Sequence, residues 1–357
     1  MTEEGRGKRE EGRGKREEGR GKSSVLLVSK VKGHLSSIVR NGGGMKRAVF
    51  FLTMLTLLSA LAGCTFLKVY LKEEIQPFEE RTLSGAGKDK ILLVDISGMI
   101  TGQDRGPALG DKKEPGLLAR VREELDRARM DGRIKAVILR INSPGGGVTA
   151  SDTLYHELKK FKRDTGSKVV AHVMDMGTSG AYYAALAADR IMAQPTSVTG
   201  SIGVIMLRLD ATGLMQKVGI QALEIASGER KGMGSPFRPL SPEERKIFQG
   251  VIDSLYGRFI TLLSEERKMP LDAVKRLADG RVYTSQEAKA AGLIDGIGYL
   301  DDAVEQAKKL ANLERARVVT YARPGEYKAN LYSMNLINID LGVTAEPGTR
   351  FMYLWWP

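Results

Sequence analysis

Three long apolar runs, separated by segments of helical periodicity, predict the core of this chain. The runs cover residues 91–96, 134–141 and 168–174, and runs of this length are typical of buried strands. Apolar residues recur at helical spacing from Leu117 to Ala128, and a second helix is predicted for residues 151–165. Strand and helix therefore alternate, which indicates an α/β domain with a largely parallel sheet.

A Gly-flanked serine follows the third of these strands. Ser179 lies between the strand and a small-residue segment, 184–188, that predicts a closely packed helix. The serine is thus expected on a strand-to-helix turn, where the first N–H groups of the helix are unpaired and can receive an anion. This position suits a nucleophile, and a serine that merely caps the turn is the alternative.

A triple-glycine loop, Gly145-Gly146-Gly147, follows the second strand. Glycines at such a place allow backbone N–H groups to approach a phosphate or an oxyanion closely. A phosphate loop would continue with Lys-Ser or Lys-Thr, whereas Val148-Thr149 follows here. We therefore favour oxyanion binding, with a tight turn as the structural alternative.

Histidine offers poor candidates for a base that could activate Ser179. The chain holds only His34, His156 and His172. His34 lies in the leader, and the other two are predicted in a helix and a strand, where a hydrogen-bonded structural histidine is expected. A desolvated lysine can serve instead, and the candidate is Lys231, in a polar, Gly-rich loop after a predicted strand at 220–225. A solvated basic loop is the alternative.

The composition fits a soluble globular body, and its charge is uneven. Of 357 residues, 42% are hydrophobic and 27% charged, with a net charge of +12. Much of that excess precedes residue 48, and the body shows no basic footprint for nucleic acid. Residues 3–22 repeat Glu-Glu-Gly-Arg-Gly-Lys-Arg without apolar positions. We expect residues 1–44 to be a disordered leader outside the natural product; a basic arm for anionic partners is the alternative.

An export signal is predicted to begin at Met45. Lys46-Arg47 precede an uncharged apolar stretch, 48–63, which is short for a membrane-spanning helix. It ends at Leu61-Ala62-Gly63-Cys64, which resembles the lipobox of bacterial lipoproteins, so Cys64 is the predicted lipidation site. An uncleaved anchor is the alternative. In both cases the body is expected outside the cytoplasm.

The remaining segments predict the organisation around the core. Residues 64–90 are interpreted as a linker, 91–323 as a single catalytic domain and 324–357 as a C-terminal extension. Ser241-Pro242-Glu243-Glu244 predicts a capped helix that runs to about Lys268. A helix at 301–312 and a strand at 318–321 follow. Residues 324–350 are expected to form loops, and the apolar tail 351–357 to dock on the body or on a neighbouring subunit.

Several motifs in register resemble the short bacterial signal peptide peptidases, the SppA-like Ser-Lys peptidases of family S49. They are Asn142-Ser143-Pro144-Gly145-Gly146, the Ser179 turn, Thr199-Gly200-Ser201-Ile202-Gly203-Val204, the Lys231 loop, and the stretches 278–284 and 291–295. The resemblance covers residues 88–310. It implies a Clp-protease/crotonase-like fold with repeated β-β-α units and no metal or nucleotide cofactor.

The resemblance also implies roles for individual residues. Ser179 would be the nucleophile and Lys231 the general base, with Ser201 orienting the lysine. The backbone N–H groups of Gly146 and Gly180 would form the oxyanion hole. Family members commonly keep a membrane-spanning anchor, so the lipobox at Cys64 is a departure that concerns attachment.

We therefore expect a serine endopeptidase on the extracytoplasmic side of a bacterial cell membrane. Its substrates would be apolar peptides such as remnant signal peptides. It would be attached to lipid through Cys64 or residues 45–63, and would form a homo-oligomer with shared active sites. The alternatives are an exported crotonase-like acyl-group binder and a non-catalytic scaffold.

Overall fold

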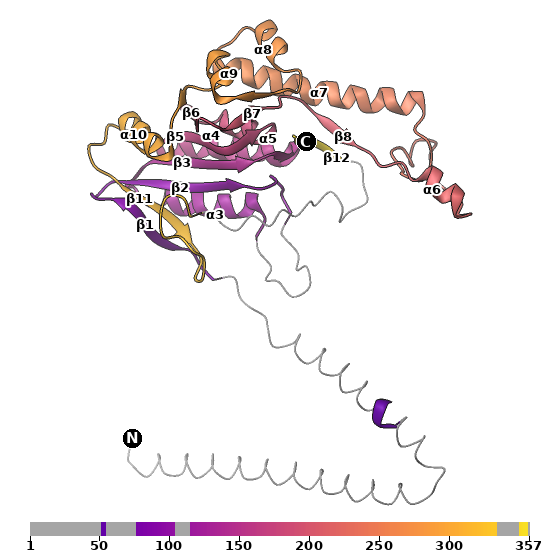
Figure 1. Ribbon diagram of the computed structural model, residues 1–357, viewed down its shortest axis with the longest axis horizontal. Coiled ribbons are helices and arrows are strands. Elements are labelled where there is room, and N and C mark those ends of the chain that lie inside the picture. Colours follow the sequence, from indigo (N-terminus) through magenta and orange to yellow (C-terminus); the bar gives the residue numbers. More distant parts are fainter. Residues whose placement is uncertain (1–50, 55–75, 104–114, 334–349, 356–357) are drawn as a thin grey trace, which may run out of the picture. The chain divides into compact units, whose positions relative to one another are not determined.

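A mixed, largely parallel sheet runs through the body of the chain (Figure 1), whose computed structural model describes residues 51–54, 76–103, 115–333 and 350–355. Its main path has the order β1-β11-β2-β3-β5-β6-β10, with β7 beside the end of β5 and β9 beside β7. The strands are β1 Glu79–Gly85, β2 Lys90–Ser97, β3 Ile134–Ser143, β5 Lys168–Thr178, β6 Arg190–Ala193, β7 Val198–Gly200, β9 Val282–Thr284, β10 Gly296–Ile297 and β11 Arg317–Ala322. The central pairs β2–β3, β3–β5 and β5–β6 are parallel, which confirms the predicted α/β class.

Helices cover both faces of this sheet. On one face, α3 and α4 pack against residues such as Leu92 and Val94, and on the other α10 packs against Ile91 and Leu93. Successive side chains of β2 point to opposite faces of the sheet, and each face is covered by its own layer of helices. Residues on both faces are therefore buried, which explains the apolar run of this strand. The helices are α3 Leu117–Arg129, α4 Val148–Thr165, α5 Gly180–Ala185, α6 Thr212–Lys217, α7 Pro242–Arg267, α8 Leu271–Leu277, α9 Ser285–Ala290 and α10 Leu300–Leu310.

The long helix α7 begins where its capping residues predict. The Ser241 side chain accepts a hydrogen bond from the Glu244 backbone N–H at 3.2 Å, and the Glu244 carboxylate accepts one from the Ser241 N–H at 3.1 Å. Pro242 is the first helical residue. This reciprocal pairing satisfies two backbone donors at the start of the helix and fixes its position.

A small second sheet has the order β4-β12-β8. Its strands are β4 Gly145–Gly147, β12 Arg350–Leu354 and β8 Ile205–Leu207. Because the glycines form a strand, helix α4 starts directly after them at Val148 rather than at residue 151. The apolar tail is therefore docked on the body, and the prediction of loops through residue 350 is wrong at its last residue, where β12 begins.

The prediction of a linker at 64–90 is wrong for residues 79–85 and for residue 90, where β2 begins. Residues 79–85 form β1, an edge strand that pairs antiparallel with β11. Its sequence is polar because an edge strand is held mainly by backbone hydrogen bonds and buries only part of its side chains. The pattern of hydrophobic and polar residues therefore did not predict this strand.

The strand predicted at 220–225 is also absent. These residues have no regular secondary structure, and Leu223 and Ile225 are 89% and 93% exposed. They belong to residues 205–240, which we call the arm; Figure 1 shows it leading from the body to α6, with α7 leading back. Apolar residues there predicted a buried strand, yet nothing in the described part of the chain buries them.

Residues 324–333 are loops, as expected, and a buried charge cluster holds them on the sheet. Asp95 of β2 accepts hydrogen bonds from Arg140 of β3 at 2.5 Å and from Lys328 at 2.6 Å. Arg140 also donates to the Leu331 and Ser333 carbonyl oxygens. All three charged side chains are almost fully buried, and the mutual pairing offsets the cost of removing them from water.

The membrane-attachment predictions fall largely outside the described residues. Cys64 and most of 45–63 lie there, as do residues 1–44. In the described ranges, no helix combines the length and apolar character that a membrane crossing requires.

Candidate active site

Ser179 lies at the sharp turn between β5 and α5. Its backbone has φ 52° and ψ −114°, a conformation that costs energy for a residue with a side chain. Two backbone hydrogen bonds hold it: the Ser179 N–H donates to Gly200 O at 2.7 Å, and its carbonyl oxygen accepts from the Tyr183 N–H at 2.8 Å. The surrounding sheet and helix thus impose a strained turn at this serine.

The Ser179 hydroxyl is buried and unpaired. The residue is 1% exposed, and its Oγ has no hydrogen-bond partner among the described residues. Burying a hydroxyl without a partner is unfavourable, so an unpaired hydroxyl on a strained turn indicates a functional position. This favours a nucleophile over a capping serine.

Gly146 and Gly180 meet beside this serine. A side-chain carbon built on Gly180 would lie 3.2 Å from the Gly146 nitrogen and 2.3 Å from Ser151 Oγ. One built on Gly146 would lie 2.1 Å from the Ile100 carbonyl oxygen. Only glycine fits at either position, and two loops distant in the sequence therefore bring their backbones together.

Strand β12 lies beside these glycines. It pairs antiparallel with β4, with Tyr353 opposite Gly146, and the Trp355 N–H donates to Pro144 O at 2.9 Å. Hydrogen-bonded pairs alternate along an antiparallel ladder, so Tyr353 and Gly146 form the next such pair. The Tyr353 carbonyl oxygen lies 3.1 Å from the carbon built on Gly180. A peptide carbonyl of the chain itself thus lies between the two glycines.

Ser201 belongs to the same neighbourhood. Strand β7 pairs with the end of β5, with Gly200 opposite Thr178, and Ser201 follows directly. Ser201 is buried, has φ 50°, and its N–H donates to Arg281 O at 2.7 Å. The fold therefore brings Ser179, Gly146, Gly180 and the Ser201 segment together.

Lys231 is not brought to this group within one chain. It is exposed, in a turn of the arm where its N–H donates to Gly228 O at 3.0 Å. Residues 227–231 line an open hollow of about 540 Å³. No ion pair or hydrogen bond joins the Lys231 ammonium to another described residue. The residues that the structure describes do not supply the covering that this lysine needs as a proton acceptor.

The histidines differ from expectation in one respect. His156 is exposed on α4, whereas His172 is fully buried in β5 with neither ring nitrogen hydrogen-bonded in the described structure. The prediction of a hydrogen-bonded structural histidine is therefore wrong for His172. Burial lowers the pKa of His172 to about 4, against a weak opposing effect of Asp302, so its ring is neutral at pH 7.

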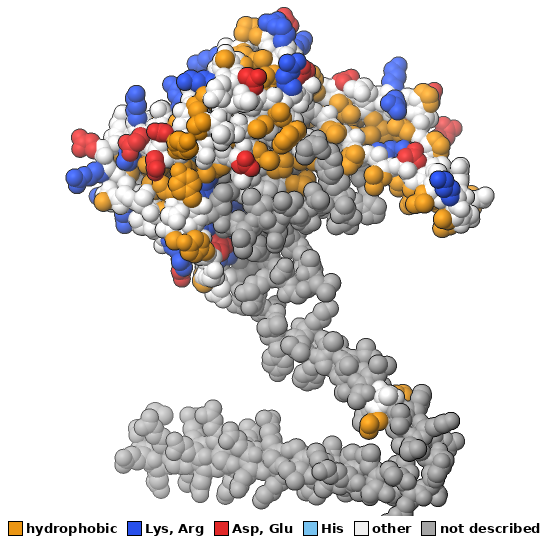
Figure 2. Space-filling view, in the orientation of Figure 1, with side chains coloured by type: hydrophobic (Ala, Val, Ile, Leu, Met, Phe, Trp, Pro, Cys, Tyr) orange, Lys and Arg blue, Asp and Glu red, His pale blue; other side chains and the backbone are white. Residues whose placement is uncertain are grey.

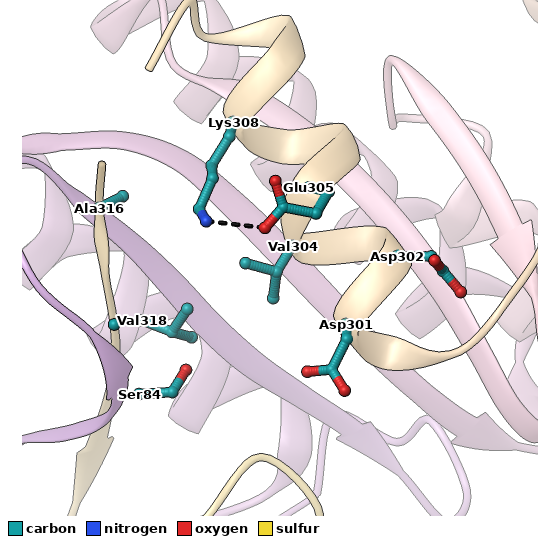
Figure 3. A pocket seen from close by; sticks show the side chains of 9 residues that line it. Ser84, Asp301, Asp302, Val304, Glu305, Lys308, Ala316 and Val318 are labelled. Atoms are coloured by element: carbon teal, nitrogen blue, oxygen red, sulfur yellow. Dashed lines mark hydrogen bonds and ion pairs between the residues drawn. The ribbon is translucent and has the colours of Figure 1, made fainter. Parts of the chain in front are cut away.

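A separate cavity of about 250 Å³ lies between β1, β11 and α10 (Figure 3). Its lining includes Asp301, Asp302 and Glu305, with Glu305 paired to Lys308 at 2.7 Å. None of the residues around Ser179 lines it. Its lining also holds the hydroxyl of Ser84, and the cavity lies apart from the serine site.

Comparison with known proteins connects this geometry to a family. The sequence profile of Peptidase family S49 matches residues 161–314. An Enterococcus faecium protein named as a signal peptide peptidase, SppA, is 35% identical over 68% of this chain and 70% of its own length. The chain belongs to peptidase family S49. The family and the protease names of its relatives make it a serine peptidase.

Two further relatives are also named as proteases. Protease 4 of Salmonella typhi is 37% identical over 53% of this peptidase and 30% of its own length. The chloroplastic serine protease SPPA of Arabidopsis thaliana is 34% identical over 71% of this chain and 38% of its own. Among solved structures, a ClpP1 variant of Listeria monocytogenes is 18% identical with a TM-score of 0.39, covering 59% of this chain and 94% of its own.

The aromatic cluster around Tyr353 was not predicted from the sequence. Tyr353, Tyr183 and Phe259 pack together, with ring centroids 5.2 Å apart for Tyr353–Tyr183 and 4.8 Å for Tyr353–Phe259. Tyr183 follows the Ser179 motif directly, but the other two lie far along the chain. The apolar character of the tail predicted that it docks, but it did not predict that the tail docks beside the glycine loop.

Proposed function

We propose that this serine peptidase hydrolyses peptide bonds with Ser179 as nucleophile and Lys231 as general base. The observation that carries the proposal is the strand that lies along the glycine loop. An extended segment of the chain lies along the glycine loop, with one carbonyl oxygen between Gly146 and Gly180, beside the unpaired Ser179 hydroxyl. This is the arrangement that a peptide substrate would need.

The chemistry follows from that arrangement. Ser179 Oγ attacks the carbonyl carbon while its proton passes to the neutral lysine amine. Negative charge then develops on the carbonyl oxygen, where the N–H groups of Gly146 and Gly180 stabilise it. The protonated lysine gives its proton to the departing amine, and water hydrolyses the acyl-enzyme by the same path. Ser201 is proposed to accept a hydrogen bond from the lysine and orient it.

A second copy of the chain is proposed to supply the cover for the lysine. The arm exposes large apolar side chains that the described part of its own chain leaves uncovered. With their exposed fractions they are Leu209 73%, Leu214 66%, Val218 59%, Ile220 57%, Leu223 89% and Ile225 93%. Figure 2 shows apolar side chains gathered over the arm and along α7. Contiguous exposed apolar surface of this kind marks an interaction site, and Lys231 lies on the same arm.

Substrates and attachment are part of the proposal. Phe351 packs on Phe248 with centroids 6.2 Å apart, and Tyr353 is fully buried, so the site beside the glycine loop favours apolar peptides such as remnant signal peptides. The chain is proposed to be held on the extracytoplasmic face of a bacterial membrane through Cys64 or residues 45–63. Mass spectrometry of the mature N-terminus tests this attachment. A lipid-modified Cys64 supports it, and a mature chain that lacks residues 45–63 and carries an unmodified Cys64 opposes it.

Three measurements test the catalytic proposal. A fluorophosphonate probe should label wild type at Ser179 and leave Ser179→Ala unlabelled, and hydrolysis of an apolar peptide should depend on the same serine. Mixing inactive Ser179→Ala with inactive Lys231→Ala protomers under subunit exchange should restore part of the activity. Verified mixed oligomers without activity would refute the shared site, and a probe that reacts elsewhere would refute Ser179.

A further inference from the structure

One hydroxyl group contacts both segments of the proposed oxyanion site. Ser151 lies in the first turn of α4 and is fully buried. Its Oγ donates to the Gly147 carbonyl oxygen at 3.0 Å, and a carbon built on Gly180 would lie 2.3 Å from the same Oγ. The Ser151 side chain therefore packs between the glycine loop and the start of α5. It takes no part in the proton transfers at Ser179.

The glycine loop depends on such contacts for its shape. Gly147 follows the proposed donor Gly146 and is held on two sides. Its N–H donates to the Ile100 carbonyl oxygen at 3.0 Å, and its own carbonyl oxygen accepts from Ser151. Glycine backbones have more conformational freedom than those of other residues. The direction of the Gly146 N–H is therefore fixed by the neighbours of the loop rather than by the loop itself.

The spacing of the Gly146 and Gly180 N–H groups decides whether they can act together. Two donors stabilise an oxyanion only when both point at the atom on which charge develops. These glycines belong to segments far apart in the sequence, and Ser151 contacts both segments at once. We infer that Ser151 is a positioning residue for the oxyanion site, and that its hydroxyl sets the spacing between the two N–H groups. The inference rests on the proposed peptidase function.

The size of the effect follows from the tight packing at this place. The space beside Gly180 is filled by Ser151 Oγ, the Tyr353 carbonyl oxygen and the Gly146 nitrogen. Ser151→Ala removes the hydrogen bond to the loop and leaves a gap next to Gly180, so the two segments can shift relative to each other. A misplacement of about 1 Å can cost about 100-fold in rate, and a smaller shift should lower kcat about 10-fold.

Thr153 provides a matched control on the same helix. Its hydroxyl donates to the Thr149 carbonyl oxygen at 2.8 Å, which is the same bond to the residue four positions earlier. The atoms nearest to a carbon built on Gly146 or Gly180 do not include Thr153. Thr153→Val therefore removes an equivalent hydrogen bond from α4 without changing the contacts of the oxyanion site.

The test measures peptide hydrolysis by the full-length enzyme and its inhibition by a peptide aldehyde. Ser179 Oγ adds to the aldehyde carbon, its proton passes to Lys231, and the former carbonyl oxygen becomes an anion in the oxyanion site. Ser151→Ala should lower kcat about 10-fold, leave KM unchanged and raise the Ki of the aldehyde about 10-fold. Thr153→Val should change none of these values.

Folding defects are separated from this effect by the Ki. Partial unfolding lowers kcat by lowering the number of active sites, which fluorophosphonate labelling carried to completion counts, but it leaves the Ki of the remaining sites unchanged. Where Ser151→Ala does not fold, Ser151→Cys fills the same place with a weaker donor and should show the same parallel change in kcat and Ki. An unchanged Ki, or a change in KM alone, would overturn the role of Ser151 while leaving the peptidase function standing. Absence of Ser179-dependent cleavage by the wild type would instead refute the peptidase function.

Discussion

The buried histidine of β5 makes a sharp stability prediction. His172 is fully buried, its nitrogens have no hydrogen-bond partner among the described residues, and its pKa is lowered to about 4. In the unfolded chain its pKa is about 6.5. Between these values the unfolded state binds more protons than the native state, so the native state loses stability as the pH falls from about 6.5 towards 4. Above that window His172 has no effect on pH dependence.

The magnitude follows from the two pKa values. Lowering the pH from 7.5 to 5.0 should cost the wild type about 2 kcal/mol of unfolding free energy through His172 alone. His172→Leu replaces the ring with an apolar side chain among apolar neighbours such as Val170 and Met192. The variant should therefore be spared this loss. Glu124, whose pKa burial raises to about 7, acts in the opposite direction but equally in both proteins.

Urea unfolding at both pH values measures the effect. The difference in unfolding free energy between His172→Leu and wild type should change by about 2 kcal/mol in favour of the variant on going from pH 7.5 to 5.0. His156→Gln, at the exposed histidine of α4, is the control and should show no such change. A difference that is the same at both pH values would refute the reasoning, because His172 would then titrate normally in the folded protein.

Three further predictions concern the site and the charge cluster. Gly180→Ala should lower kcat/KM at least about 100-fold, because its Cβ would meet Ser151 Oγ and the Gly146 amide. Gly250→Ala on α7 meets open space and should retain activity. An active Gly180→Ala would contradict the site geometry. Lys328→Met should lower the unfolding free energy by about 3 kcal/mol, because Asp95 loses a buried partner. Lys308→Met, at an exposed ion pair, should lower it by less than about 1 kcal/mol. Equal losses in denaturant titrations would argue against a stabilising role of the buried charge cluster. Intact-mass measurement should find residues 354–357 removed from the wild type and kept in Ser179→Ala, since the Tyr353 carbonyl oxygen lies close to Gly180, the residue after the serine. An intact wild-type tail would count against cleavage at this bond.

The sequence alone determined the α/β core and the two glycine-rich loops. Continuous apolar strands such as 134–141 and the capped start of α7 at Pro242 follow from local patterns, because periodicity and capping act over a few residues. The Gly-flanked serine and the triple glycine could be recognised for the same reason. Each motif carries its own backbone requirement in its own residues.

Tertiary structure decided which of these parts meet, and where the rest of the chain goes. The polar strand β1 exists because β11 offers it an edge, and residues 220–225 are no strand because nothing described in their own chain pairs with them. Gly146, Ser179 and Gly200 adjoin only through parallel pairing of β3, β5 and β7. Tyr353 reaches this place from the far end of the chain by joining β4. Such contacts depend on register between distant segments, which no local pattern of hydrophobic and polar residues encodes.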